Sequence, residues 1–130
     1  MSTLSKRYIT AMPTVSDFVQ LSDSSIDLKL GLDIDRTLER NISSAPASGE
    51  GALLTWNIRR EGAGSVTYTV KINSGLVNTY TVTLADWSAV QNAMDTSAIK
   101  QGKNTVEFRV TGGTGTLSFS DVVLFYRKNV

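Results

Sequence analysis

Carboxylates are the side chains of this sequence that could carry chemistry, because the chain contains no histidine and no cysteine. Without those residue types, neither Ser-His-Asp and Cys-His relays nor the usual zinc and iron ligand sets can be built. Two carboxylic acids could still hydrolyse a glycosidic bond. The candidates show no signature of such a pair: Asp33, Asp35, Glu39, Glu50, Glu61, Asp86, Asp95, Glu107 and Asp121. The sequence therefore predicts a protein that is not an enzyme.

Calcium is the metal that the carboxylates could hold. Asp27, Asp33 and Asp35 share one parity of an alternating segment and could present oxygen atoms to it. Lys29 shares that parity, and its charge opposes a bound cation. Water-facing carboxylates are also ordinary on the outer side of a strand. We predict no metal site and no cofactor, and leave calcium binding open.

The charges of the chain are balanced, with 13 Lys and Arg against 12 Asp and Glu and a formal net charge of +1. The basic pairs, such as Arg59-Arg60, are smaller than the clusters that follow nucleic-acid phosphates. The segment Met1–Gln20 lacks the apolar run of a signal peptide, and no stretch approaches the ~20 apolar residues of a membrane span. We therefore expect no nucleic-acid or membrane partner and, by default, a cytoplasmic location.

Alternation of apolar and polar residues is the strongest structural signal, and it is typical of strands with one buried face. It recurs in these segments: Ile26–Asp35, Leu53–Arg60, Val66–Asn73, Leu76–Leu84, Val106–Val110 and Thr116–Arg127. Trp56 and Tyr68 have the apolar parity, which predicts that both lie in the core. Glycine-containing segments after Arg60, Ile72 and Val110 predict hairpins.

Two segments depart from the alternation. Trp87, Val90 and Met94 follow Asp86 at helical spacing, which predicts a short helix over Trp87–Met94 that closes an open end. The apolar run Val122–Tyr126 indicates either a central strand covered on both faces or a bulge near Ser120-Asp121. Asp121 could then be a buried, hydrogen-bonded acid, a bulge residue or a ligand contact.

These elements predict one domain of the all-β class, an antiparallel jelly-roll β-sandwich with one short helix. The chain of 130 residues has the length of a single domain. We assign residues 26–130 to the sandwich. Residues 1–25 have apolar residues without a clean period, and we interpret them as edge strands or as an arm that packs on a neighbouring subunit.

The segment Ile99–Val110 carries a resemblance to a known group of proteins. Its sequence IKQGKNTVEFRV resembles the strand entry leucine-x-x-Gly-x-Asn-x-aliphatic-x-apolar-x-Val of galactose-binding-like jelly-roll domains. That group includes many carbohydrate-binding modules, and the resemblance covers about Gly51 to Arg127. It implies a sandwich whose members often bind sugars through loops at one end, sometimes with a structural calcium.

Two functional hypotheses follow. The first is a non-catalytic, lectin-like module that binds carbohydrate through loop-end residues such as Arg59, Arg60, Asn73 and Trp87. Trp87 could stack on a sugar ring or plug the core. The second is a structural or assembly subunit, such as a virion, tail or oligomeric accessory protein, that forms homo-oligomers through residues 1–25 and has no small-molecule ligand.

Overall fold

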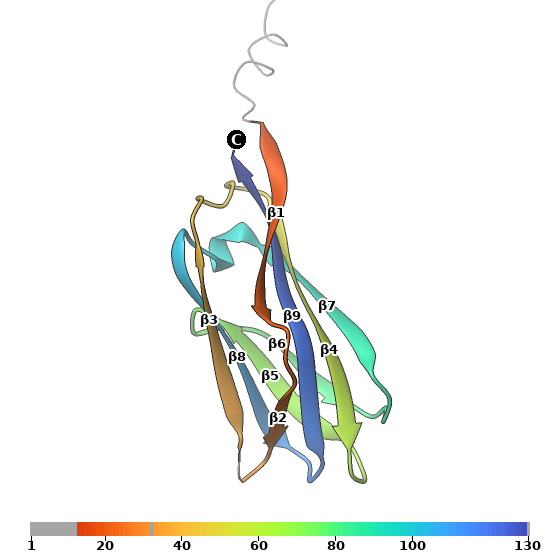
Figure 1. Cartoon of the computed structure of the whole chain (residues 1–130). Helices are drawn as coiled ribbons and strands as arrows, with labels where there is room; N and C mark the ends of the chain where they lie inside the picture. Colours follow the sequence, from red (N-terminus) through yellow and green to blue (C-terminus); the bar gives the residue numbers. More distant parts are fainter. Residues whose placement is uncertain (1–12, 32, 130) are drawn as a thin grey trace, which may run out of the picture.

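The computed structural model describes residues 13–31 and 33–129, which form two antiparallel sheets packed face to face (Figure 1). Sheet A has the order β1-β9-β4-β7, with β2 beside the first part of β9, and sheet B has the order β3-β8-β5-β6. The strands are β1 (Thr14–Ser22), β2 (Ile26–Lys29), β3 (Asp35–Ile42), β4 (Gly51–Glu61), β5 (Val66–Ile72), β6 (Gly75–Val82), β7 (Ser88–Asp95), β8 (Gly102–Gly112) and β9 (Thr116–Asn129). The predicted all-β jelly-roll β-sandwich is confirmed.

The core lies between the two sheets and is built around aromatic rings from both. The inward residues of β4, β5 and β8 alternate with outward ones, as the sequence pattern predicts. Trp56 packs edge to face on Phe108 at a centroid distance of 5.3 Å, and Tyr68 on Phe119 at 5.1 Å. The Trp56 indole N–H donates to the Tyr68 hydroxyl at 3.0 Å. The predicted core positions of Trp56 and Tyr68 are confirmed.

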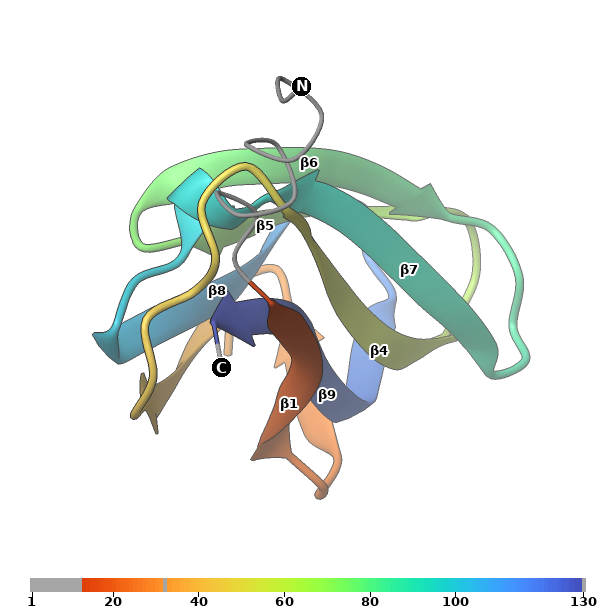
Figure 2. The same ribbon diagram turned by 90° about the horizontal axis from the view of Figure 1, so that it is seen from above.

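Burial raises the pKa of the Tyr68 phenol, because a phenolate would be poorly solvated between the sheets. Tyr68 is therefore the neutral acceptor of the Trp56 N–H. At the side of the sandwich where β6 and β7 lie, Asn92 is buried and joins the sheets (Figure 2). Its Oδ1 accepts hydrogen bonds from the Tyr80 hydroxyl and, at 3.3 Å, from the Asn78 amide.

The prediction of a single strand over Ile26–Asp35 is wrong. β2 ends at Lys29, the chain turns at Gly31 with φ 90°, and β3 begins at Asp35 in the other sheet. Residues of the same parity face the core in both strands, Leu28 from β2 and Ile42 from β3, because the strands lie on opposite sides of it, whereas Leu30 in the turn is exposed. Leu32, which belongs to that pattern, lies outside the described residues.

The predicted helix over Trp87–Met94 is also wrong, because this segment forms strand β7, which pairs with β4. Val90, Asn92 and Met94 point inward with a period of two, and a polar residue at the middle position hid that period. The helical turn that the structure does contain is η1 (Thr96–Ala98), a single 3-10 turn after β7. Trp87 is 45% exposed and does not plug the core.

The reversals between strands divide into two kinds. The β5–β6 hairpin is confirmed, with Asn73 and Ser74 at positive φ between the paired residues Ile72 and Gly75. The predicted hairpins after Arg60 and Val110 are wrong, because both connections cross from one sheet to the other. Glycines suit either kind of reversal, so their presence did not distinguish them.

The predicted bulge in β9 is confirmed at Asp121, which has φ 52°. The register between β4 and β9 shifts here, since Thr55 pairs with Val123 and Asn57 pairs with Ser120. Asp121 is exposed, so its interpretation as a buried acid is wrong. Its carboxylate accepts a hydrogen bond from the Asn57 amide at 3.1 Å.

Candidate functional site

The outer face of sheet A brings together side chains from four strands. The outward residues of β4 are flanked by residues of β9 on one side and β7 on the other, in the rows Phe125–Leu53–Ala93, Val123–Thr55–Gln91 and Ser120–Asn57–Ala89. β1 extends the first two rows, because Phe18 pairs with Phe125 and Gln20 pairs with Val123. Each row therefore crosses the sheet at a right angle to the strands.

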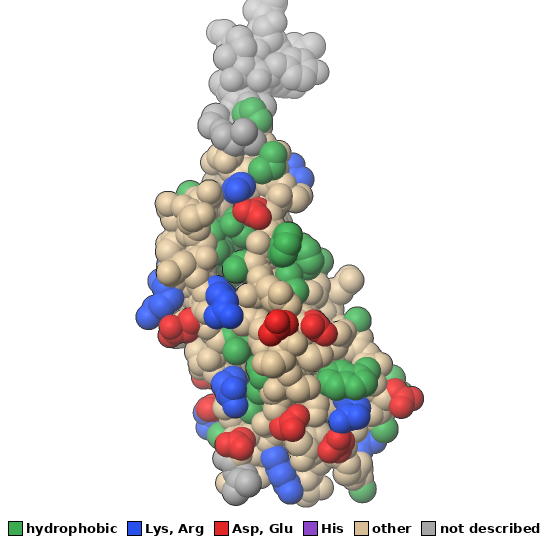
Figure 3. Space-filling view, in the orientation of Figure 1, with side chains coloured by type: hydrophobic (Ala, Val, Ile, Leu, Met, Phe, Trp, Pro, Cys, Tyr) green, Lys and Arg blue, Asp and Glu red, His purple; other side chains and the backbone are tan. Residues whose placement is uncertain are grey.

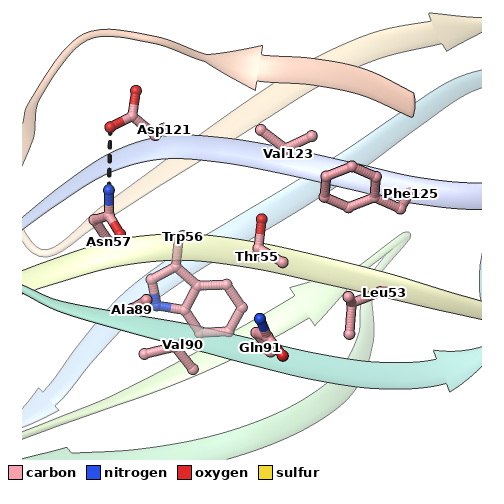
Figure 4. Close-up of a pocket in the computed structure, with 10 residues that line it drawn as sticks. All are labelled: Leu53, Thr55, Trp56, Asn57, Ala89, Val90, Gln91, Asp121, Val123 and Phe125. Carbon is pink, nitrogen blue, oxygen red and sulfur yellow. Dashed lines mark hydrogen bonds between the residues drawn. The ribbon is translucent and has the colours of Figure 1, made fainter.

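This face is hollowed into a groove with a volume of about 490 Å³, lined by residues of β4, β7 and β9 (Figure 4). A second hollow of about 260 Å³ shares Leu53 and Phe125 with it and continues toward Ser16 and Arg127. The groove forms because Ala89 on β7 has a short side chain, whereas Val123 and Phe125 on β9 have larger ones.

One end of the groove is aromatic. The rings of Phe18 and Phe125 lie 6.1 Å apart between centroids, and they are 63% and 41% exposed. Large apolar side chains are usually buried, so two neighbouring exposed rings mark a surface with affinity for apolar groups. Figure 3 faces sheet A and shows an exposed hydrophobic patch in the upper half of this face, with charged side chains toward its lower end.

The middle of the groove is polar and uncrowded. Thr55, Asn57 and Gln91 supply a hydroxyl and two amides, and Asp121 adds a carboxylate. The Asn57 amide is oriented by its hydrogen bond to Asp121, whose Oδ2 also accepts from the Ser120 hydroxyl at 3.2 Å. These groups offer both donors and acceptors to a polar ligand.

The other end of the face holds two of the residues that the sequence analysis proposed for ligand binding. The Arg59 guanidinium lies 5.2 Å from the centre of the Trp87 ring and pairs with Glu61. A cation over an indole ring is attracted to its electron-rich face. The arginine thus contacts the Trp87 ring, part of which remains in solvent.

The other two proposed residues are placed differently. Arg60 donates to the Gly62 carbonyl and, at 3.1 Å, to the Thr83 carbonyl, so it ties two loops together near Arg59. Asn73 lies at the opposite end of the sandwich, in the β5–β6 turn. Its amide donates to Ala98 and Asn104, and its oxygen accepts from the Thr105 N–H at 3.0 Å. The structure therefore brings Arg59, Arg60 and Trp87 together and separates Asn73 from them.

Sequence reasoning missed Phe18, Asn57, Gln91 and Phe125. The outward parity of Asn57 was a signal that could have found it. Gln91 was assigned to a helix, and the parity of Phe125 depends on the bulge before it. Phe18 lies in β1, whose sequence has no clean period.

Two of the three carboxylates considered for calcium, Asp27 and Asp35, are engaged elsewhere. Asp27 accepts from the Ser118 hydroxyl at 2.7 Å, and Asp35 pairs with Arg109 at 3.0 Å. Among residues 13–31 and 33–129, no group of three or more potential ligands of the His, Cys, Asp and Glu types could hold a metal ion. Over the same residues, no helix is long and apolar enough to cross a membrane.

The chain was compared with family models, curated protein sequences and solved structures. No family model and no curated protein sequence matches the chain. Among solved structures, dimeric latent PorU from Porphyromonas gingivalis gives a TM-score of 0.66 at 8% identity, over 92% of this chain and 13% of PorU. A family 35 carbohydrate-binding module from Clostridium thermocellum gives 0.55 at 14% identity, over 84% of this chain and 97% of the module.

A family 29 carbohydrate-binding module complexed with cellulohexaose gives a TM-score of 0.56 at 13% identity, over 88% of this chain and 92% of the module. The fold of the chain is thus the β-sandwich seen in carbohydrate-binding modules. The predicted resemblance to that group is confirmed at the level of the fold.

Proposed function

We propose that this protein is a non-catalytic carbohydrate-binding module that holds a glycan chain in the groove on the outer face of sheet A. The observation that carries the proposal is the groove itself, with exposed aromatic rings at one end, an exposed tryptophan beyond the other, and amides between them. A sugar ring has an apolar C–H face that can stack on an aromatic ring and hydroxyls that pair with amides and carboxylates.

The length of the face favours a chain over a single sugar. From Leu53 to Arg59 the strand advances six residues, which is about 20 Å at the usual rise of a strand. Phe125 lies beside Leu53, and Trp87 lies at Arg59. The fold shared with carbohydrate-binding modules, one of them complexed with cellulohexaose, supports the same conclusion by analogy.

Each group of side chains has a distinct part in the proposed binding. Phe125, with Phe18 behind it, stacks on one sugar ring. Asn57 and Gln91 form hydrogen bonds with hydroxyls in the middle of the chain. Trp87 stacks on a ring at the far end, and its contact with Arg59 reduces the side-chain entropy that is lost when the sugar binds.

The proposal is tested by calorimetric titration of the protein with a panel of soluble polysaccharides and their oligosaccharides: β-glucans, xylans, mannans and galactans. For a glycan that binds, Phe125→Ala and Gln91→Ala each remove about 1 kcal/mol of interaction, which weakens binding about fivefold. Leu76→Ala is the matched control, because Leu76 is 62% exposed on sheet B and its loss leaves the groove unchanged.

Three results would count against the proposal. Absence of binding across the panel would remove carbohydrate as the ligand class. Binding that Trp87→Ala weakens and Phe125→Ala does not would move the site to the loop end at Arg59 and Arg60. Release of reducing ends during incubation with any of the polysaccharides would contradict the non-catalytic role.

A further inference from the structure

The edge strands of the two sheets differ in how they are protected against pairing with another chain. β3 carries four charged residues among eight: Asp35, Arg36, Glu39 and Arg40. The edge formed by β1 and β2 is divided between two strands, and both carry charges. β6 has a bulge, since Val70 and Lys71 pair with Asn78 and Leu76. Charges, interruptions and bulges are the usual means of blocking an exposed edge.

β7 lacks these protections over most of its length. Residues 88–94 contain no charged residue, no proline and no glycine, and their register with β4 is unbroken from Ser88 to Asp95. Asp95, at the last position, is the single charge in the strand. Within the part of the chain that the structure describes, no strand covers its outer edge.

The backbone groups on this edge can be assigned from the neighbouring hydrogen bonds. Thr96 N–H donates to the Glu50 carbonyl at 3.1 Å, and this pair continues the register between β4 and β7. In an antiparallel ladder the residues that bond to the neighbouring strand alternate with those that face away. Ala89, Gln91 and Ala93 therefore direct their N–H and C=O groups away from β4. The Ala93 carbonyl accepts a 3.3 Å bond from the Asn92 amide, and the others face the open edge.

We infer that a second copy of this chain pairs antiparallel with β7, so that the two copies of sheet A form one continuous sheet about a twofold axis. A neutral strand suits a copy of itself, because antiparallel self-pairing of residues 88–94 sets no like charges opposite each other. The neighbouring strand β6, on the same side of the sandwich (Figure 2), also contains no charged residue. β6 and residues 88–94 of β7 therefore bring no charge repulsion to the approach of the copy.

The pairing also completes the groove. On its β7 side the groove is lined by Ala89 and Gln91, and beyond them the sheet ends. A second copy supplies the missing wall and sets the two grooves side by side on one surface. The pairing itself does not depend on carbohydrate binding, so either can fail without the other.

Sedimentation velocity over a range of protein concentrations tests the inference. The unmodified chain is expected to form a dimer as concentration rises. Ala93→Pro removes an N–H that faces away from β4 and is expected to abolish the dimer without unfolding the sheet, which circular dichroism checks. Thr37→Lys, which places a charge on β3 at the opposite edge of sheet B, is the control and is expected to leave the dimer intact. A monomer at every concentration, or a dimer that Ala93→Pro preserves, overturns the inference.

A cysteine scan gives a second readout that does not rely on the proline variant. The chain has no cysteine, so single cysteines at each position from 89 to 93 report only on contacts between copies. The residue on the twofold axis lies opposite itself, at a Cα distance of about 4.5–5.5 Å that a disulfide can span. Oxidation is expected to cross-link one of these variants and not Thr79→Cys on β6. Cross-linking only at Thr79→Cys, or at none of the positions, overturns the inference.

Discussion

Replacing Tyr68 by phenylalanine removes one hydroxyl from the centre of the core and leaves the ring in place. The Trp56 indole N–H donates to that hydroxyl at 3.0 Å, and both side chains are buried. A buried donor that loses its acceptor costs about 1–3 kcal/mol, because its bond to water in the unfolded chain is not replaced. We expect Tyr68→Phe to lower the free energy of unfolding by that amount, although every aromatic contact of the ring is kept.

Urea unfolding followed by far-ultraviolet circular dichroism measures this change. The control is Tyr126→Phe, whose hydroxyl forms a longer bond, 3.3 Å, to the partly buried Asp17; since Asp17 keeps its ion pair with Lys128, the loss is expected to lower the free energy of unfolding by less than about 1 kcal/mol. A double-mutant cycle with Trp56→Phe isolates the hydrogen bond, because in the Trp56→Phe background Tyr68→Phe leaves no buried N–H without an acceptor. The reasoning is refuted if Tyr68→Phe costs no more than Tyr126→Phe, or if the two core substitutions are additive.

Three further predictions concern the loops and the strand β9. Gly113 and Gly64 both have positive φ, but a Cβ at Gly113 would lie 2.2 Å from a backbone oxygen, whereas a Cβ at Gly64 meets nothing within 4 Å. Urea unfolding should therefore show that Gly113→Ala lowers the free energy of unfolding by at least about 2 kcal/mol more than Gly64→Ala does. Equal decreases for the two variants would contradict this prediction. In the same assay Asp121→Val should lower the free energy of unfolding by about 1–2 kcal/mol, because a β-branched residue fits φ 52° poorly. Asp121→Asn should change the free energy of unfolding by less than about 0.5 kcal/mol. A hydrogen bond from Lys128 lowers the pKa of Asp17, so the ionised carboxylate stabilises the fold at neutral pH, and this stabilisation is lost as the pH falls through the lowered pKa. Lys128→Met should therefore reduce the decrease in the free energy of unfolding between neutral and acidic pH, measured by urea unfolding at a series of pH values. An unchanged pH dependence would argue against the Asp17–Lys128 pair.

Alternation predicted the faces of the strands well and their partners poorly. It placed Trp56 and Tyr68 in the core, because burial of one strand face requires a period of two. Parity does not say which sheet a strand joins, since residues that point into a sandwich from opposite sides have the same pattern. For that reason β4 and β5 were predicted to pair, although they lie in different sheets.

β7 shows a second limit of the sequence pattern. Its inward residues are Val90, Asn92 and Met94, and the polar one in the middle bonds to Tyr80 and Asn78 of the opposite sheet. A buried polar residue whose partners are distant in sequence breaks the apolar period. Helical spacing is then matched by Trp87, Val90 and Met94, although the segment is a strand that pairs with β4.

The candidate site depends on the register of four strands, which is why it could not be located from the sequence. In β9, Leu117 and Phe119 point into the core before the bulge at Asp121, and Val122, Leu124 and Tyr126 do so after it. Without that one extra residue, Val123 and Phe125 would take the inward parity and the groove would lose its larger wall. The Asn57 amide bonds to the Asp121 carboxylate at the same point, so the residue that turns the aromatic ring outward also orients the polar part of the groove. A single backbone irregularity thus places Val123 and Phe125 of a core strand on the outer face of sheet A.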